Sequence, residues 1–169
     1  MMNSPYFTFT IACLIEILTS CLVNLLSYSS LIKIYKFLKT RSFERGGKIY
    51  QDIFRVKLWK DYVPAFGTFD KKHISTIVSK NYMATFLLES IRAELVHLFC
   101  IITTTTFFLL SHSELKRSLL LFFLLINIPC IIIQRYNRPR FERILSARGG
   151  VTEAFLSLES ELIRSPERR

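Results

Sequence analysis

The sequence predicts an all-α integral membrane protein with about three transmembrane helices and cytosolic, interfacial amphipathic helices. Half of the 169 residues are hydrophobic, and most of them fall in three long apolar runs. The 23 Lys and Arg residues outnumber the 13 Asp and Glu residues, and they gather in blocks that follow these runs. Apolar runs flanked by basic blocks are typical of membrane spans. We expect one membrane-embedded domain over residues 1–145 and a cytosolic tail over 146–169.

The first apolar run, residues 5–32, is the strongest candidate for a span. It exceeds the roughly 20 residues that cross a bilayer, and Glu16 is its only acidic or basic residue. No Lys or Arg precedes Lys33, whereas a cleaved signal peptide begins with a basic segment. We therefore expect a retained transmembrane helix here, although nothing in the sequence explains Glu16.

The second and third apolar runs, residues 93–110 and 118–133, are short for transmembrane helices. At 1.5 Å per residue they reach about 24–27 Å, just under the roughly 30 Å hydrocarbon core. They are separated by a tight connection over residues 111–117. The sequence therefore allows either two short spans in a locally thinned bilayer or a re-entrant hairpin.

The basic blocks predict the orientation of the chain in the cell membrane. Loops rich in Lys and Arg stay on the cytosolic side. Blocks of this kind follow the first and the third run: Lys33, Lys36, Lys39, Arg41, Arg45 and Lys48, then Arg135, Arg138, Arg140 and Arg143. We expect a multi-pass protein with its N-terminus outside, residues 33–92 inside and its C-terminus in the cytoplasm.

The segment between the first two spans has an amphipathic pattern. Arg45, Lys48, Asp52, Arg55 and Trp59 recur at helical spacing, which predicts an interfacial helix. Its basic stripe suits attraction to anionic membrane lipids, and it would equally suit the phosphates of a donor molecule or a partner. A turn at residues 64–67 and a second amphipathic pattern from residue 74 lead into the second run.

The most concentrated polar chemistry lies at the start of the second run, where Glu94 and His97 share a helix face. A neutral imidazole oriented by Glu94 would suit a general base. The alternative is a histidine that only hydrogen-bonds to a neighbouring helix. The motifs of common soluble enzymes are missing, and the four cysteines form no CxxC pair. We expect no metal and no cofactor.

A second polar cluster, Gln134-Arg135-Tyr136-Asn137-Arg138-Pro139-Arg140, follows the third run. Arginine forks bind carboxylate or phosphate groups, and Asn137 could orient a hydroxyl or a carbonyl. The alternative is an ordinary basic stop after a span. We expect Pro139 to end the helix.

Several motifs together resemble the glycosyl-4,4'-diaponeurosporenoate acyltransferase family. They are Phe43-Glu44-x-x-Gly47-Lys48, Val56-x-x-Trp59-Lys60-Asp61, Arg92-Ala93-Glu94-Leu95-x-His97, Asn127-x-Pro129 and the cluster Gln134 to Arg140. The similarity runs in order from about Phe43 to Phe141. The resemblance implies a membrane acyltransferase that esterifies a sugar hydroxyl of a glycosylated C30 carotenoid acid, or of a similar lipid glycoside, with a fatty acyl chain, as in staphyloxanthin-type pigment synthesis.

The resemblance also marks residues that we assign to roles by hypothesis. His97, polarised by Glu94, would take the proton from the sugar hydroxyl, and Asn137 or a neighbouring arginine would stabilise the oxyanion. The substrate-binding positions would be Trp59, Lys60, Arg92, Asn127, Arg135, Arg138 and Arg140. The implied partners are membrane lipids, a glycosylated carotenoid acceptor and a fatty acyl donor, either acyl-CoA or acyl carrier protein; a homo-oligomer is compatible with this reading.

Two other classes of function stay open from the residues alone. A non-catalytic membrane adaptor would use the basic segment for recruitment and would use Glu94 and His97 to join helices. A small transporter subunit would line a polar path with Glu16, His97 and Asn127. We do not expect nucleic-acid binding, because the basic residues flank apolar runs.

Overall fold

The computed structural model describes residues 5–63, 79–112 and 114–164, and the part of the chain that it describes is helical, without strands. The chain divides into two compact units. Unit 1 comprises residues 1–26 and 92–132, and unit 2 comprises residues 27–91 and 133–169. We describe each unit by itself. Whether residues 1–145 act as one domain stays a prediction.

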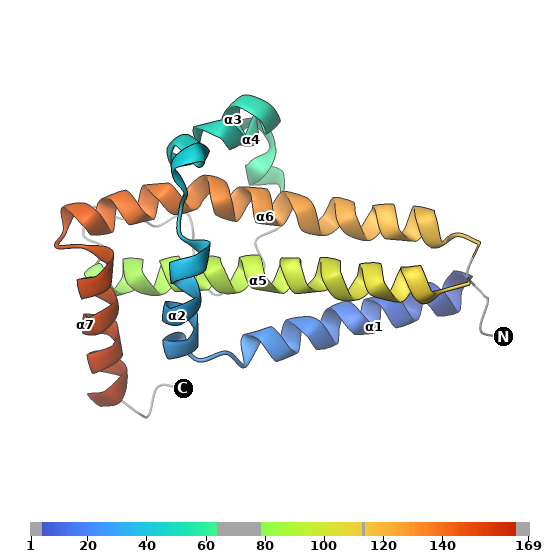
Figure 1. Cartoon of the computed structure of the whole chain (residues 1–169), viewed down its shortest axis with the longest axis horizontal. Coiled ribbons are helices and arrows are strands. Elements are labelled where there is room, and N and C mark those ends of the chain that lie inside the picture. Colours follow the sequence, from blue (N-terminus) through green and yellow to red (C-terminus); the bar gives the residue numbers. More distant parts are fainter. Residues whose placement is uncertain (1–4, 64–78, 113, 165–169) are drawn as a thin grey trace. The chain divides into compact units, whose positions relative to one another are not determined.

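Three helices are long and apolar enough to cross a membrane: α1 (Pro5–Asn24), α5 (Lys80–Leu110) and α6 (Lys116–Ala147) (Figure 1). The prediction of an all-α membrane protein with about three candidate spans is thus confirmed. At 1.5 Å per residue, the 20 residues of α1 extend about 30 Å. That length matches the hydrocarbon core of a bilayer.

The bounds of these helices differ from those expected. The expected span over 5–32 ends at Asn24, and a second helix, α2 (Tyr28–Leu38), begins after a short break. The side chain of Ser27 caps α2 by accepting a hydrogen bond from the backbone N–H of Ser30. The runs 93–110 and 118–133 belong to helices of 31 and 32 residues. Both helices are long enough to cross a bilayer, so their length no longer favours a re-entrant hairpin.

In unit 1, α1 and the unit's parts of α5 and α6 pack side by side. Thr19 of α1 contacts Thr103 of α5, and Glu16, which comes earlier in α1, contacts Thr104, which comes later in α5. The two helices are therefore antiparallel. An apolar cluster of Ala12, Phe108 and Phe123 joins all three helices. Burial of these side chains stabilises the bundle and fixes which face of each helix points inward.

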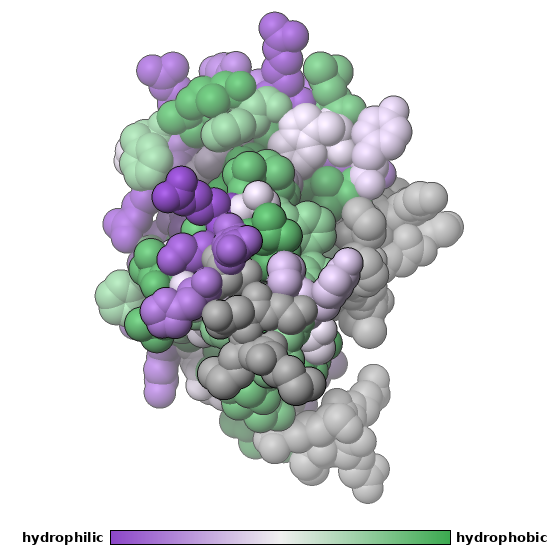
Figure 2. All heavy atoms as spheres, turned by 90° about the vertical axis from the view of Figure 1, so that its right-hand side faces the viewer, coloured by the Kyte–Doolittle hydropathy of each residue, from purple (hydrophilic) through white to green (hydrophobic). Residues whose placement is uncertain are grey.

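The outer face of α1 is also apolar. Leu14, Ile17, Leu18 and Leu22 recur at helical spacing and are each more than half exposed. Apolar side chains reach the molecular surface seen in Figure 2 as well. An apolar face of this kind is what a lipid-facing helix presents, because water would oppose its exposure.

The basic segment of unit 2 is a series of short helices, not one amphipathic helix. It comprises η1 (Ser42–Gly47), α3 (Lys48–Phe54), α4 (Val56–Trp59) and η2 (Lys60–Tyr62). Left-handed backbone angles interrupt it at Arg45 and Arg55, both with φ of 49°. A left-handed residue cannot continue an α-helix, so the prediction of a continuous helix here is wrong. The turn expected at 64–67 and the start of the amphipathic pattern expected from residue 74 lie outside the described residues. The rest of that pattern, with Tyr82, Phe86 and Leu87, lies on α5 (Lys80–Leu110).

Gly47 allows this segment to pack directly on α6. Its φ is +87°, in the region that favours glycine. A Cβ atom at this position would lie 2.8 Å from the carbonyl oxygen of Tyr136, closer than real Cβ contacts. The motif around Gly47 is therefore held against the backbone of α6 in unit 2.

Pro139 does not end its helix, contrary to the prediction. The helix α6 continues through Pro129 and Pro139 to Ala147. Proline removes one helical hydrogen bond but does not prevent the chain from continuing when packing holds it. Pro139 is buried, and its ring lies near the Gly47 position, which supplies such packing.

The segment expected as a tail forms a packed helix, α7 (Val151–Arg164), after the glycine turn that ends α6. Phe155 meets the ring of Tyr35 edge to face, with centroids 5.2 Å apart. The hydroxyl of Ser29 donates to Glu159 at 2.9 Å. Elsewhere in the unit, the rings of Phe86 and Phe141 join α5 to α6 with centroids 4.3 Å apart.

Candidate functional site

A chain of polar side chains crosses the interior of unit 1. Nδ1 of His97 on α5 lies 2.8 Å from Oδ1 of Asn127 on α6. The amide nitrogen of Asn127 donates to both carboxylate oxygens of Glu16 on α1, at 3.2 and 3.1 Å. The hydroxyl of Thr104 donates to Glu16 at 2.9 Å. We call Glu16, His97, Thr104 and Asn127 the polar cluster.

The polar cluster lies within the three candidate spans, where Glu16 and His97 are half-buried and the other two members are buried. Asn127 is 2% exposed and Thr104 is 1% exposed. The apolar cluster of Ala12, Phe108 and Phe123 lies on one side of it along α1, and Cys100 and Thr103 make polar contacts with α1 on the other. Polar groups in such a place are costly unless they bond to one another. Their grouping makes the cluster the leading candidate for a functional site.

Helical spacing explains why these residues meet. His97, Cys100 and Thr104 recur at three- and four-residue steps on α5, so they lie along the face that packs on α1. On α6, Asn127 lies one turn after Phe123, and its amide also donates to the Phe123 carbonyl at 3.0 Å. Thus α1 and α6 each bring one polar side chain to the cluster, and α5 brings two that lie about two turns apart.

Sequence reasoning brought Glu16, His97 and Asn127 together only as the polar path of a transporter subunit, and not as an enzyme site. Glu16 had no explanation, and Thr104 was not considered as a site residue. The signal for Glu16 was its position as the only acidic or basic residue of the first apolar run. Its partners depend on how three helices turn their faces, which one-dimensional spacing does not contain.

The expected pair of Glu94 and His97 lies in unit 1, about one turn apart on α5. Glu94 is 3% exposed, and His97 is half-buried. The partner of Nδ1 that orients the imidazole is the amide oxygen of Asn127, and not Glu94. A catalytic role for Glu94 stays a prediction.

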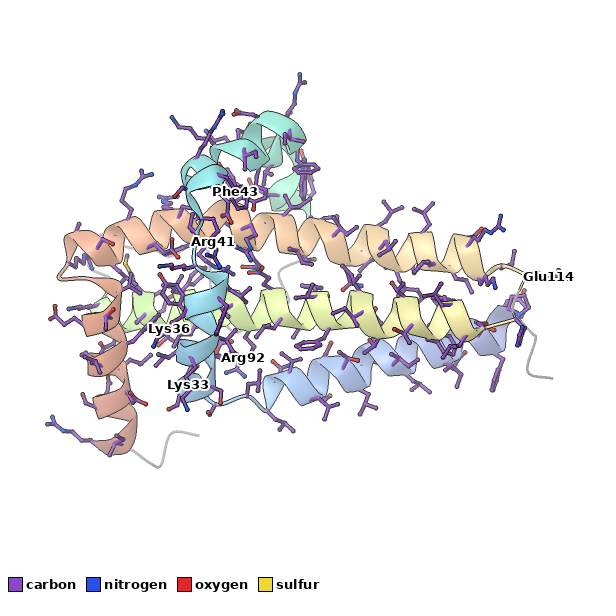
Figure 3. All side chains as sticks on the ribbon, in the orientation of Figure 1. Lys33, Lys36, Arg41, Phe43, Arg92 and Glu114 are labelled. Atoms are coloured by element: carbon purple, nitrogen blue, oxygen red, sulfur yellow. The ribbon has the colours of Figure 1, made fainter. Side chains whose placement is uncertain are left out.

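Arg92, another expected binding residue, closes the end of α1 (Figure 3). Its Nη1 donates to the backbone carbonyls of Asn24 and Leu26, both at 2.8 Å. The last carbonyls of a helix lack helical partners and carry partial negative charge. The guanidinium therefore stabilises the C-terminus of α1.

Two further arginines, Arg135 and Arg138, bind protein atoms inside unit 2. Arg135 forms an ion pair with the buried carboxylate of Glu44 at 3.1 Å. Arg138 is fully buried and donates to the carbonyl of Leu38 at 2.7 Å and to that of Ser90 at 3.3 Å. These bonds connect α2 and η1 to α5 and α6. A further role of either arginine in substrate binding stays a prediction.

The remaining expected site residues lie in unit 2 and are more accessible. Trp59 donates from its indole nitrogen to the Phe54 carbonyl at 2.7 Å, and Lys60 pairs with Asp61 at 2.7 Å. Asn137 is half-buried, and Arg140 is exposed. The structure therefore groups Asn127 and His97 in unit 1, and it places Trp59, Lys60, Asn137 and Arg140 in unit 2.

One perturbed group lies outside the spans, on α2. Burial raises the pKa of the Tyr35 hydroxyl well above its ordinary value, and the neighbouring Glu142 carboxylate adds to this rise. The hydroxyl donates to Glu142 at 3.0 Å. Tyr35 is thus a neutral structural donor in unit 2. Over the described ranges, no group of three His, Cys, Asp or Glu side chains is placed to hold a metal ion.

Comparison with known proteins gives a consistent family. The family of glycosyl-4,4'-diaponeurosporenoate acyltransferases matches residues 33–147. A protein of that name from Staphylococcus aureus (strain N315) is 34% identical over 124 residues, which cover 68% of this chain and 73% of the relative. Another from Staphylococcus haemolyticus (strain JCSC1435) is 32% identical and covers 71% and 72%. No solved structure matches. The chain therefore belongs to the glycosyl-4,4'-diaponeurosporenoate acyltransferase family and is an acyltransferase.

Proposed function

We propose that this protein transfers a fatty acyl group to a sugar hydroxyl of a glycosylated C30 carotenoid acid within the cell membrane. The family name supports the reaction and the acceptor. Three candidate spans with apolar outer faces support a membrane site, where a carotenoid and an acyl chain are both soluble. The observation that carries the chemical proposal is the hydrogen bond between Nδ1 of His97 and Asn127.

In the proposed mechanism, His97 acts as the general base. A neutral imidazole whose Nδ1 is occupied by Asn127 presents its Nε2 lone pair to a substrate hydroxyl. The sugar oxygen then forms a bond to the acyl carbon of a thioester, and its proton passes to Nε2. When the carbon–sulfur bond breaks, the imidazolium returns this proton to the leaving thiolate.

Other residues complete the proposal. The exposed Arg140 is suited to an anionic donor, either acyl-CoA or acyl carrier protein. Trp59 and Lys60 would contribute to binding from the basic segment. Glu94 would adjust the electrostatics near His97 from its buried position.

We also propose the orientation given by the basic blocks, with the N-terminus outside and the C-terminus in the cytoplasm. This orientation would bring the basic segment to anionic lipids and to a cytosolic acyl donor. Lys33 and Lys36 project from α2, as Figure 3 shows. Association of copies in the membrane is part of the same proposal.

The test is co-expression with enzymes that make the glycosylated C30 carotenoid acid, followed by mass spectrometry of the extracted pigments. We expect a new species that is heavier by one fatty acyl group. His97→Gln should remove this species while the protein remains in the membrane, because glutamine can hydrogen-bond but cannot act as the base. Thr10→Val is the matched control, since Thr10 is exposed and bonds only within α1 to the Tyr6 carbonyl.

Two results would contradict the proposal. An unchanged glycoside, with wild-type protein shown in the membrane, would exclude this acceptor. Full product from His97→Gln would exclude His97 as the base and leave the acyl transfer to other residues.

A further inference from the structure

The carboxylate of Glu16 has no role in the reaction as proposed so far. It lies in the middle of α1, in a segment otherwise free of acidic and basic side chains. It accepts hydrogen bonds from Thr104 on α5 and Asn127 on α6. An ionisable side chain in a candidate span is costly to place, so its presence calls for a function.

The contacts of Asn127 fix which way its amide points. The Nδ2 side faces three acceptors: both oxygens of Glu16 and the carbonyl oxygen of Phe123. The reverse orientation would bring the amide oxygen against these oxygens and would lose every one of the bonds. The amide oxygen of Asn127 must therefore face His97.

The orientation of Asn127 in turn fixes the proton of His97. An amide oxygen can only accept, so the imidazole nitrogen 2.8 Å away must donate. The neutral His97 ring then carries its hydrogen on Nδ1 and its lone pair on Nε2. Free neutral imidazole side chains favour the opposite arrangement, with the hydrogen on Nε2, so this tautomer is imposed by its surroundings.

We infer that Glu16 is a positioning residue: through Asn127 it holds His97 in the tautomer whose Nε2 can accept a proton. Thr104 assists by donating to one oxygen of Glu16 and so orienting the carboxylate. The negative charge of Glu16, one amide away, also stabilises the imidazolium that forms when His97 takes the proton. The catalytic part of this inference rests on the proposed function, but the tautomer does not.

The test reads the tautomer directly by nitrogen NMR. The protein is labelled with ring-15N histidine and reconstituted in lipid nanodiscs, at a pH well above the titration range of imidazole. The chain has three histidines, and the signals of His97 are identified by their loss in His97→Gln. Protonated and unprotonated ring nitrogens resonate at well-separated frequencies, so the measurement needs no activity.

Two substitutions at position 16 separate the expected outcomes. Glu16→Leu keeps a similar volume but removes two of the three acceptors of the Asn127 amide and leaves only the Phe123 carbonyl. The preference of Asn127 for its orientation therefore weakens, and His97 shifts toward the Nε2–H tautomer. Glu16→Gln keeps one acceptor for Asn127 and should retain the Nδ1–H tautomer. Turnover should fall by between about tenfold and 10⁴-fold in Glu16→Leu, the larger figure being the cost of a wrong tautomer in a serine protease. Glu16→Gln should recover most of this loss, and Thr10→Val should match wild type.

The results distinguish this inference from the proposed function. An Nε2–H tautomer in the wild-type protein, or an Nδ1–H tautomer that persists in Glu16→Leu, would overturn the role of Glu16. A tautomer that follows the substitutions while turnover stays unchanged would support the positioning role and refute His97 as the base.

Discussion

Arg138 provides a sharp test of how unit 2 is held together. We predict that Arg138→Leu destabilises this unit by about 2–4 kcal/mol, from the loss of buried hydrogen bonds to two backbone carbonyls. The guanidinium is fully buried and donates to the carbonyls of Leu38 and Ser90. After the substitution both carbonyls stay in place, so an apolar side chain cannot compensate them.

The magnitude follows from the partners that remain. The Ser90 carbonyl lies inside α5 and keeps its helical N–H partner, but it loses the charged donor of Arg138. A buried hydrogen bond from a charged donor contributes about 1–3 kcal/mol. The Leu38 carbonyl keeps a weaker donor, Arg135 at 3.3 Å, so its loss is nearer to 1 kcal/mol. Together these changes lower the ratio of folded to unfolded protein roughly 30- to 700-fold, at tenfold for every 1.4 kcal/mol.

The assay is unfolding by SDS in mixed micelles, followed by the fluorescence of Trp59. Trp59 is the only tryptophan in the sequence, and it belongs to unit 2. The matched control is Arg140→Leu, which removes an exposed arginine two positions further along α6. If Arg138→Leu and Arg140→Leu unfold within about 0.5 kcal/mol of each other, the typical range of surface substitutions, the structural role of Arg138 is refuted.

Three further predictions concern Gly47 and Tyr35 in unit 2 and Arg92 in unit 1. Gly47→Ala should destabilise unit 2 by about 1–3 kcal/mol from backbone strain alone. The loss should exceed that of the control Gly150→Ala, because Gly150 has a similar φ but no atom within 4 Å of the new Cβ. Equal unfolding midpoints of the two variants in SDS would exclude the close approach of Gly47 to α6. Burial and Glu142 raise the pKa of Tyr35 above its ordinary value of 10.0. The contribution of the neutral Tyr35 hydroxyl to stability is therefore complete below pH 10, and it is lost as the pH rises from there through the raised pKa. Unfolding midpoints should therefore fall above pH 10 in wild type and fall less in Tyr35→Phe; parallel curves would contradict this. Arg92→Leu should lower the stability of unit 1 by about 1–2 kcal/mol, because it removes the donor from two backbone carbonyls at the end of α1. The measurement is the fraction of folded protein that size-exclusion chromatography finds after heating. An unchanged fraction would refute the capping role of Arg92.

The main helices could be predicted from the sequence because they depend on local composition. Long apolar runs with few charges form helices in a membrane whatever their neighbours are, so α1, α5 and α6 were found. The breaks were not found, because nothing in the local sequence marks Arg45 and Arg55 for left-handed backbone angles, which residues other than glycine rarely adopt. The prediction that Pro139 ends the helix was wrong because the preference of proline is local, whereas the packing near its ring involves Gly47, a residue far away in the sequence.

The candidate site was predicted in part. His97 and Asn127 were each selected, since polar residues in apolar runs are rare and costly. Their direct contact could not be predicted, because it depends on the rotation of α5 against α6. The arginines show a different limit: the family resemblance marked Arg92 and Arg138 as substrate-binding residues, and the structure shows that backbone carbonyls are their acceptors.

The pairing of α2 with α7 has a consequence for biosynthesis. The hydrogen bond from Ser29 to Glu159 joins residues 130 positions apart. At a synthesis rate of 5–20 residues per second, α7 leaves the ribosome roughly 6 to 26 seconds after α2. During this interval Tyr35, half-buried in the finished unit, lacks the ring of Phe155 that packs on it. Unit 2 is therefore completed only after α7 has been made.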